Sequence, residues 1–277
     1  MSRSRKYTPE LENIEIQLLL EGISRHYGFE FQEYAVAPMR RRIWQSIRRE
    51  KVRTISGLQE KLLHDYPAME RFLTALSNGG SPYGPAFFVT FRNDVVPLLR
   101  TYPFVRIWQA GCHSARELYT LAILLQEEGL YEKSTIYATD VNEQNLQRVS
   151  DGVFPLAAVP EYSALYEESG GIESFTKYFS GGGRSGIFDQ NLKRNIVFAQ
   201  HNLATDSSFN EFNTILCRNI LSAYNDKIQA RAHKVLYESL GLFGVLGLGP
   251  KESIHASPKE SCYAELDSEH RLYRKIR

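Results

Sequence analysis

The sequence is poor in cysteine, and it has neither a long apolar run nor an excess of charge of one sign. Its three cysteines, Cys112, Cys217 and Cys262, are odd in number and far apart, which argues against a disulfide framework and a CxxC metal site. We therefore expect buried free thiols and no bound metal. No segment reaches the about 18 consecutive apolar residues that cross a membrane. Residues 1–15 also lack the apolar centre of a signal peptide, so we expect no membrane insertion and a cytoplasmic location.

The near balance of charge argues against two classes of partner. The chain has 33 Lys and Arg against 32 Asp and Glu, a formal charge of +1, which gives no overall attraction to nucleic acid or to a lipid surface. It also lacks a recognisable nucleic-acid-binding motif, so we expect no nucleic-acid partner. With 277 residues, 43% of them hydrophobic, the chain can bury a sizeable core and corresponds to roughly two domains of about 100–200 residues.

The N-terminal part reads as helical. Apolar residues recur at spacings of three and four residues in "LENIEIQLLLEGISRHYG" (11–28) and "APMRRRIWQSIRREKV" (37–52). This spacing is typical of amphipathic helices. We predict a helical domain over residues 1–76. The segment "SNGGSPYGP" (77–85) then concentrates glycine and proline, which indicates a linker.

Residues 86–277 alternate strand-like and helical patterns. This order predicts an α/β domain with a mostly parallel sheet, whose ligands bind at the carboxyl ends of the strands. A stretch at about 152–194 interrupts the alternation and is too long for a plain loop, so we expect a small inserted subdomain there. The predicted strands are 105–111, 135–141, 195–203, 213–219 and 243–249.

Polar residues stand at the ends of these predicted strands. Asp140 lies about 29 residues after Gly111, where the carboxylate of a dinucleotide-binding sheet accepts ribose hydroxyls; capping of the following helix is the alternative. Arg218 and Asn219 end the fourth strand, beside the expected crevice, and residues of these types are also common in turns. Asn202 ends the third strand, where an Asx-turn is the competing explanation.

The order and spacing of several motifs resemble the CheR family of S-adenosylmethionine-dependent protein-glutamate O-methyltransferases. The resemblance covers most of the chain, to about residue 252. Each motif alone is weakly specific, but their order and spacing together are specific. It implies a helical domain joined to a Rossmann-like methyltransferase domain that carries a small inserted β-subdomain. The motifs are "RIWQAGC" (106–112), "ELYTLAILL" (117–125), "ATDVNEQNL" (138–146), "VFAQHNL" (197–203), "FNTILCRNIL" (212–221) and "LGLGPKES" (246–253).

The resemblance also implies a cofactor, S-adenosylmethionine or its product S-adenosylhomocysteine, and assigns residues to its site. No catalytic acid or base is implied, because methyl transfer to a carboxylate needs mainly a positioned cofactor and acceptor. The implied site consists of Ala110 and Gly111 in the first turn, Asp140 at the ribose, Asn202 and Leu203 at the adenine, and Arg218 and Asn219 in the pocket wall.

The first turn departs from the family pattern. Where members carry a turn like GCSTGEE, this chain reads "GCHSARE" (111–117), so Ala115 replaces a glycine and Arg116 an acid. A Cβ where positive φ is needed costs about 1 kcal/mol. A cation about 4 Å from the cationic cofactor would cost up to roughly 4 kcal/mol at an effective dielectric near 20, unless the long side chain turns away.

Two further elements depart from the pattern. The arginine of the family segment NVTxFFRD falls near Tyr83 or Gly84, and no basic side chain is present at either position. Arg92 in "FFVTFRND" imitates the motif by composition, but its use would require the loss of about half a helix. After "CRN", the family tyrosine position holds Ala223, with Tyr224 one residue late.

These departures favour a degraded methyltransferase, a pseudoenzyme of a bacterial chemosensory pathway that acts by binding a ligand or partner. The ligand would be S-adenosylmethionine, S-adenosylhomocysteine or another nucleotide that the altered pocket admits. An active protein-glutamate methyltransferase of chemoreceptors is the alternative.

A basic helix is the expected docking surface for a chemoreceptor or another signalling protein. The family's helical domain contacts acidic receptor bundles, and dense arginines make one helix face electropositive; a solvated face without a partner is the alternative. The arginines concerned are Arg40, Arg41, Arg42, Arg48 and Arg49.

Overall fold

The chain folds into two compact units. The computed structural model describes residues 7–27, 36–65, 68–69, 71–72, 75, 84–112 and 115–277. One unit, the helical unit, comprises residues 1–79 and 222–228; the other, the sheet unit, comprises 80–221 and 229–277. Most of the predicted linker, 77–83, lies outside the described residues. In the part of the chain that is described, no helix is both long and apolar enough to span a bilayer.

The helical unit is built on amphipathic helices, as predicted: α1 (Pro9–Tyr27), α2 (Val36–Arg49) and α3 (Ile55–His64). Thr54 caps α3 by accepting a hydrogen bond from the Gly57 amide at 2.9 Å. Glu50, directly after α2, accepts two hydrogen bonds from the Arg71 guanidinium and lies 3.2 Å from Lys61. These bonds lower the pKa of Glu50 to about 2. The apolar faces meet in a core that includes Leu19, Ile23, Ile43, Leu58 and Leu62.

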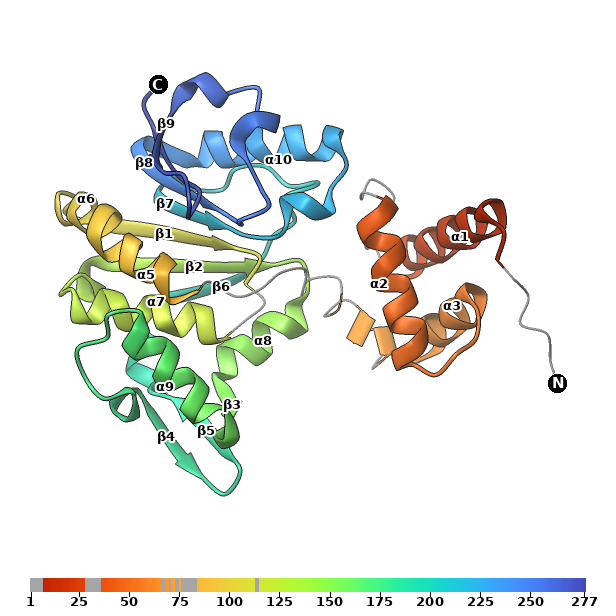
Figure 1. The fold of residues 1–277 in the computed structure, drawn as a ribbon, viewed down its shortest axis with the longest axis horizontal. Coiled ribbons are helices and arrows are strands. Elements are labelled where there is room, and N and C mark those ends of the chain that lie inside the picture. Colours follow the sequence, from red (N-terminus) through yellow and green to blue (C-terminus); the bar gives the residue numbers. More distant parts are fainter. Residues whose placement is uncertain are drawn as a thin grey trace. The chain divides into compact units, whose positions relative to one another are not determined.

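The sheet unit contains a seven-stranded sheet in the order β6-β2-β1-β7-β8-β10-β9 (Figure 1). The first five strands in this order pair in parallel, and β10 runs antiparallel to both β8 and β9, so the predicted mostly parallel sheet is confirmed. The β9–β10 hairpin was not predicted. The strands are β1 (Val105–Ala110), β2 (Ser134–Asp140), β6 (Ile196–Gln200), β7 (Phe212–Cys217), β8 (Leu240–Leu248), β9 (Tyr263–Asp267) and β10 (Leu272–Lys275).

Helices cover the sheet because its strands direct apolar side chains towards both faces. Val105 and Ile107 of β1 join a core formed with α5 (Pro85–Thr90), α6 (Val96–Arg100) and α7 (Ala115–Glu127). Trp108, which alternation turns to the other face, packs on Phe212 at a centroid distance of 5.3 Å. A further helix is α10 (Asp226–Ser239). The described residues also form short 3₁₀ helices: η2 (Tyr131–Lys133), η3 (Leu156–Ala158), η4 (Phe175–Tyr178), η5 (Gln190–Leu192), η6 (Leu221–Ala223), η7 (Ile254–Ala256) and η8 (Glu260–Cys262).

A small antiparallel sheet, β3-β5-β4, lies within the stretch predicted as an insertion, and it confirms the inserted β-subdomain. Figure 1 shows it with α9, apart from the larger sheet. Its Phe188 ring stacks on Tyr119 of α7 at 4.3 Å, which fixes the subdomain against the main core. The region follows α8 (Glu143–Asp151), and its longer elements are β3 (Val153–Pro155), α9 (Val159–Glu168), β4 (Phe179–Gly182) and β5 (Ser185–Phe188).

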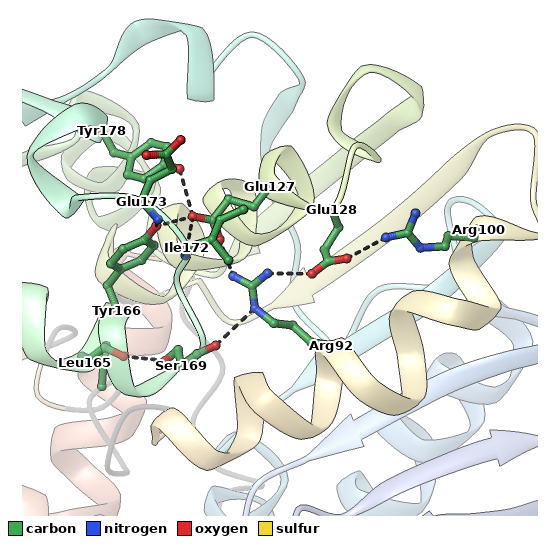
Figure 2. Close-up of polar contacts among 10 residues, drawn as sticks. All are labelled: Arg92, Arg100, Glu127, Glu128, Leu165, Tyr166, Ser169, Ile172, Glu173 and Tyr178. Atoms are coloured by element: carbon green, nitrogen blue, oxygen red, sulfur yellow. Dashed lines mark hydrogen bonds and ion pairs between the residues drawn. The ribbon is translucent and has the colours of Figure 1, made fainter.

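A buried polar network also ties the insertion to the core (Figure 2). It centres on Arg92, which lies in a π-helical turn, η1 (Phe91–Val95), between α5 and α6. Its guanidinium lies 2.5 Å from Glu127 and 2.7 Å from Glu128 at the end of α7, and it donates to the Ser169 carbonyl after α9 at 3.2 Å. Arg92 is therefore committed to a structural network, and it does not take the place of the family arginine that it imitates in composition.

The three cysteines are free. Cys112 and Cys217 are fully buried, as predicted, and burial raises the pKa of the Cys217 thiol. Cys262 is only half-buried, so the expectation of a buried thiol is wrong there. It lies in η8, just before the edge strand β9, where one side of the chain is open to solvent.

Buried His233 on α10 makes the stability of the sheet unit depend on pH. Its side chain is 2% exposed, and burial lowers its pKa from 6.5 to about 4. Because the unfolded chain takes up a proton at a higher pH than the folded one does, the stabilising contribution is present above about pH 6.5 and is lost towards pH 4. At pH 5 we expect a loss of about 2 kcal/mol, at 1.36 kcal/mol per pH unit.

Urea unfolding at pH 7 and pH 5 of wild type and His233→Gln measures this contribution. The variant should lose about 2 kcal/mol less stability between the two pH values than the wild type, whatever the substitution costs at pH 7. Equal pH dependence of the two proteins would show that protonation of His233 does not control acid stability.

Candidate functional site

The first strand end requires glycine. Gly111 follows β1 with φ +72°, and a Cβ built on it would lie 2.1 Å from Cδ1 of Ile220. Only glycine adopts this conformation without strain and leaves this space. Ala110 before it is 2% exposed. The turn after β1 is further fixed by the Cys112 amide, which donates to the Thr139 carbonyl of β2 at 2.7 Å.

The end of β2 places a carboxylate beside this turn. Asp140 is 3% exposed and accepts hydrogen bonds from the Asn142 amide at 2.9 Å and from Asn145 Nδ2 at 3.2 Å. Asn145 also donates to the Cys112 carbonyl at 3.1 Å, so it joins the two strand ends. The helix cap weighed as the alternative role of Asp140 belongs instead to Asn142, which accepts from Gln144. Each Asp140 oxygen has more than one acceptor site, so the carboxylate can also accept from a ligand.

Asn202 forms the Asx-turn that was weighed against a role at the cofactor. Its Oδ1 accepts from the Ala204 amide at 3.0 Å, and its own amide donates to Asp206 at 2.8 Å. Next to it, Leu203 is 4% exposed, and the His201 ring stands edge-on to Trp108. The two hydrogen bonds of Asn202 fix the turn at the end of β6.

The ends of β7 and β8 are joined by a buried acid. Glu252 Oε2 accepts from the amides of Asn219 and Gly249, both at 2.8 Å, and Asn219 has φ +58°. One residue earlier, Arg218 lies 3.7 Å from Glu117 of α7, with side-chain exposures of 11% and 5%. The second acid of the family turn is thus retained as Glu117, and it pairs with the arginine of "CRN".

Arg116 contacts the insertion through its guanidinium. Its guanidinium lies 2.7 Å from Glu161 of α9 and over the Tyr162 ring at 5.7 Å, and its side chain is 13% exposed. The ion pair and the ring contact compensate its charge locally. The long side chain thus contacts the insertion, where its charge has a partner.

Some site residues were missed in the sequence although their motifs were recognised. Glu252 belongs to "LGLGPKES", and Asn145 belongs to "ATDVNEQNL". Their positions after strands were a usable signal. The groups that they contact across the site, the Asn219 amide for Glu252 and the Cys112 carbonyl for Asn145, come from other segments. His113, Ser114 and Tyr83 lie outside the described residues, and Gly84 is the N-cap residue of α5.

Only some of the predicted docking arginines are exposed. Arg42 is 4% exposed, so its inclusion in the electropositive surface is wrong: it lies on the inner side of α2, next to the buried Ile43. Arg40 is engaged by Asn13 at 3.1 Å and Glu12 at 3.2 Å. Arg41 and Arg48, seven residues apart and so on one helix face, are exposed, as is Arg49.

Comparisons with known proteins identify the family. "CheR methyltransferase, SAM binding domain" matches residues 83–269, and "CheR methyltransferase, all-alpha domain" matches residues 14–77. A Pseudomonas putida protein named "Putative methyltransferase Cher3" is 40% identical over 95% of this chain and 97% of its own length. A chemotaxis protein methyltransferase of Listeria monocytogenes is 28% identical over 84% of this chain and 87% of its own length. The chain belongs to the CheR methyltransferase family.

Proposed function

We propose that this protein is a chemosensory signalling protein that binds S-adenosylmethionine or S-adenosylhomocysteine and a protein partner, and that its methyl transfer to glutamate is weakened or lost. The strand ends support cofactor binding. Gly111 keeps the positive φ that lets a ligand approach the turn, and Asp140 offers buried acceptors at the end of β2. A carboxylate at this strand end and a glycine in the first turn are the groups that bind the ribose and approach the ligand in dinucleotide-binding sheets.

The ion pair of Arg116 with Glu161 carries the cofactor half of the proposal. A free guanidinium about 4 Å from a cationic sulfonium or ammonium would weaken binding by up to roughly 4 kcal/mol, about a thousandfold. Because the guanidinium pairs with Glu161 of α9, we expect this cost to be smaller. Cofactor binding is therefore compatible with the altered "GCHSARE" turn.

Weak transfer is inferred from two family positions whose side chains are changed. When bound, the cofactor supplies the electrophilic methyl group, so the protein contributes mainly the positions of the reacting groups. Tyr83 or Gly84 occupies the position of the family arginine, and Ala223 that of the family tyrosine. Loss of two positioning groups lowers the rate of transfer without closing the cofactor pocket.

Titration calorimetry with S-adenosylhomocysteine, followed by transfer of a labelled methyl group to chemoreceptor fragments, tests both halves. We expect micromolar binding and little or no labelled receptor. An absence of heat at millimolar S-adenosylhomocysteine would contradict cofactor binding. Fast, stoichiometric labelling would establish the second candidate, a competent protein-glutamate methyltransferase, which the preserved Arg218–Glu117 pair favours.

Glu161→Ala is expected to weaken binding of S-adenosylmethionine about tenfold, because it frees Arg116 to approach the cationic cofactor. A tenfold change corresponds to about 1.4 kcal/mol, part of the upper bound above. Calorimetry measures the effect. Glu161→Ala with Arg116→Ala is the matched control and should restore the wild-type affinity. If the single variant binds as the wild type does, the position of Arg116 is irrelevant to the cofactor.

The partner half of the proposal rests on the exposed arginines of α2. Arg41, Arg48 and Arg49 form a basic surface that suits an acidic receptor bundle. Cytoplasmic location is part of the same proposal, because chemoreceptor methylation regions face that compartment by the family resemblance.

A further inference from the structure

A small cavity opens at the carboxyl ends of β7 and β8. It has a volume of about 90 Å³ and is lined by Arg218 after β7, Leu248 at the end of β8, Gly84 and the start of α5, and Glu269 and His270 of the β9–β10 turn. Because β10 runs antiparallel to β8, this turn lies at the same edge of the sheet as the strand ends of the site. The cavity therefore adjoins the residues proposed for the cofactor.

His270 is fixed in this cavity by its own turn. Its Nδ1 lies 3.0 Å from Asp267 Oδ1 and 3.2 Å from Thr90 Oγ1, and its backbone amide donates to the same Asp267 oxygen at 2.5 Å. The side chain is 16% exposed. Since both ring contacts use Nδ1, Nε2 on the opposite side of the imidazole is the nitrogen available to a ligand. An imidazolium ring donates from both nitrogens.

The size and chemistry of the cavity select a small anion. A volume of about 90 Å³ holds a small group such as a carboxylate with its methylene. Arg218 contributes guanidinium donors, and Leu248 and Phe87 contribute apolar walls. Glu117 balances part of the Arg218 charge. A carboxylate in the cavity therefore needs a second donor besides Arg218, and His270 lines the same cavity. Glu269 is exposed, and water screens its charge.

We propose that this cavity binds a carboxylate and that His270, oriented by Asp267, is the positioning residue that donates to it from Nε2. The inference rests on the proposed function and deepens it. Gly84, beside the position where the family arginine is missing, lines the cavity, so the histidine supplies a donor at a place that has lost one. The carboxylate belongs either to the acceptor glutamate or to the amino-acid part of the cofactor.

Nitrogen-15 NMR of the imidazoles in the full-length protein distinguishes these sources. With S-adenosylhomocysteine bound, addition of N-acetylglutamate α-amide should shift the His270 Nε2 resonance, whereas the neutral glutamine analogue should not. If S-adenosylhomocysteine alone shifts it and 5′-methylthioadenosine does not, the cofactor carboxylate occupies the cavity. If no carboxylate shifts it although calorimetry shows S-adenosylhomocysteine binding, the inference is wrong and the proposed function stands.

A variant measures the size of the effect. His270→Ala should weaken binding of the responding carboxylate at least about tenfold, the usual loss of a charge-assisted hydrogen bond. His255→Ala is the matched control, because His255 is 74% exposed and pairs with Glu260 outside the cavity. Equal affinities of the two folded variants would overturn the assignment. Should His270→Ala not fold, the NMR titration of the wild type still decides.

Discussion

Replacing Arg92 with methionine is expected to lower the free energy of unfolding of the sheet unit by about 3–5 kcal/mol. Removal of one partner from a buried ion pair leaves the other charge unpaired in a medium of low polarity, which costs this much. The side chains of Arg92 and Glu127 are 12% and 2% exposed, so water has little access to the carboxylate. Urea unfolding followed by far-ultraviolet circular dichroism measures the loss.

The cost is high because Glu127 serves several segments at once. Its Oε1 also accepts from the hydroxyls of Tyr166 and Tyr178 and from the Ile172 amide (Figure 2). Burial and these bonds to the Glu127 carboxylate raise the pKa of Tyr178, which keeps its hydroxyl protonated as a donor. Without Arg92, the tyrosines alone must stabilise the carboxylate, and the contact between the insertion and α7 loosens.

Arg100→Met is the matched control. Arg100 lies 2.7 Å from Glu128, the other acid bound by Arg92, but its side chain is 54% exposed. Exposed pairs contribute about 0–1 kcal/mol, so this variant should stay within 1 kcal/mol of wild type. If Arg92→Met and Arg100→Met cost the same, burial of the network has no energetic consequence and the argument fails.

Much of the fold could be predicted because it follows from local patterns. Apolar periodicity located the helices of the first unit, and strand-like runs located the parallel strands. The β9–β10 hairpin was missed because its strands, "YAELD" (263–267) and "LYRK" (272–275), are too short to show a clear alternation. Motif order, rather than any single motif, identified the family.

Individual side-chain roles could not be predicted because their partners lie far along the chain. Arg116 was expected near the cofactor, yet its partner Glu161 lies 45 residues away in the insertion. Asp140 was weighed as a helix cap, but Asn142, two residues later, has the extended backbone that a cap requires. Arg42 was assigned to the surface from charge density alone, whereas its register on α2 turns it inwards. Sequence fixes which residue types reach a strand end, and packing decides what they contact.

Gly111→Ala is expected to destabilise the sheet unit by about 2–4 kcal/mol and to weaken S-adenosylhomocysteine binding at least tenfold. The positive φ costs an alanine about 1 kcal/mol, and overlap with Ile220 adds about 1–3 kcal/mol. Binding suffers to the extent that the turn, and not the Ile220 side chain alone, moves to relieve the overlap. Thermal unfolding and calorimetry on the same variant measure the two effects.

Two controls separate conformational strain from steric overlap at this turn. Gly129→Ala has a similar φ of +68° but no atom within 4 Å of the added Cβ, so it should cost only about 1 kcal/mol. Gly111→Ala with Ile220→Ala removes the overlapping atoms and should recover cofactor affinity relative to Gly111→Ala, although the smaller side chain itself reduces packing. If Gly111→Ala binds S-adenosylhomocysteine as the wild type does, the turn after β1 has lost its role at the cofactor, and the ligand of this protein must be sought elsewhere along the strand ends.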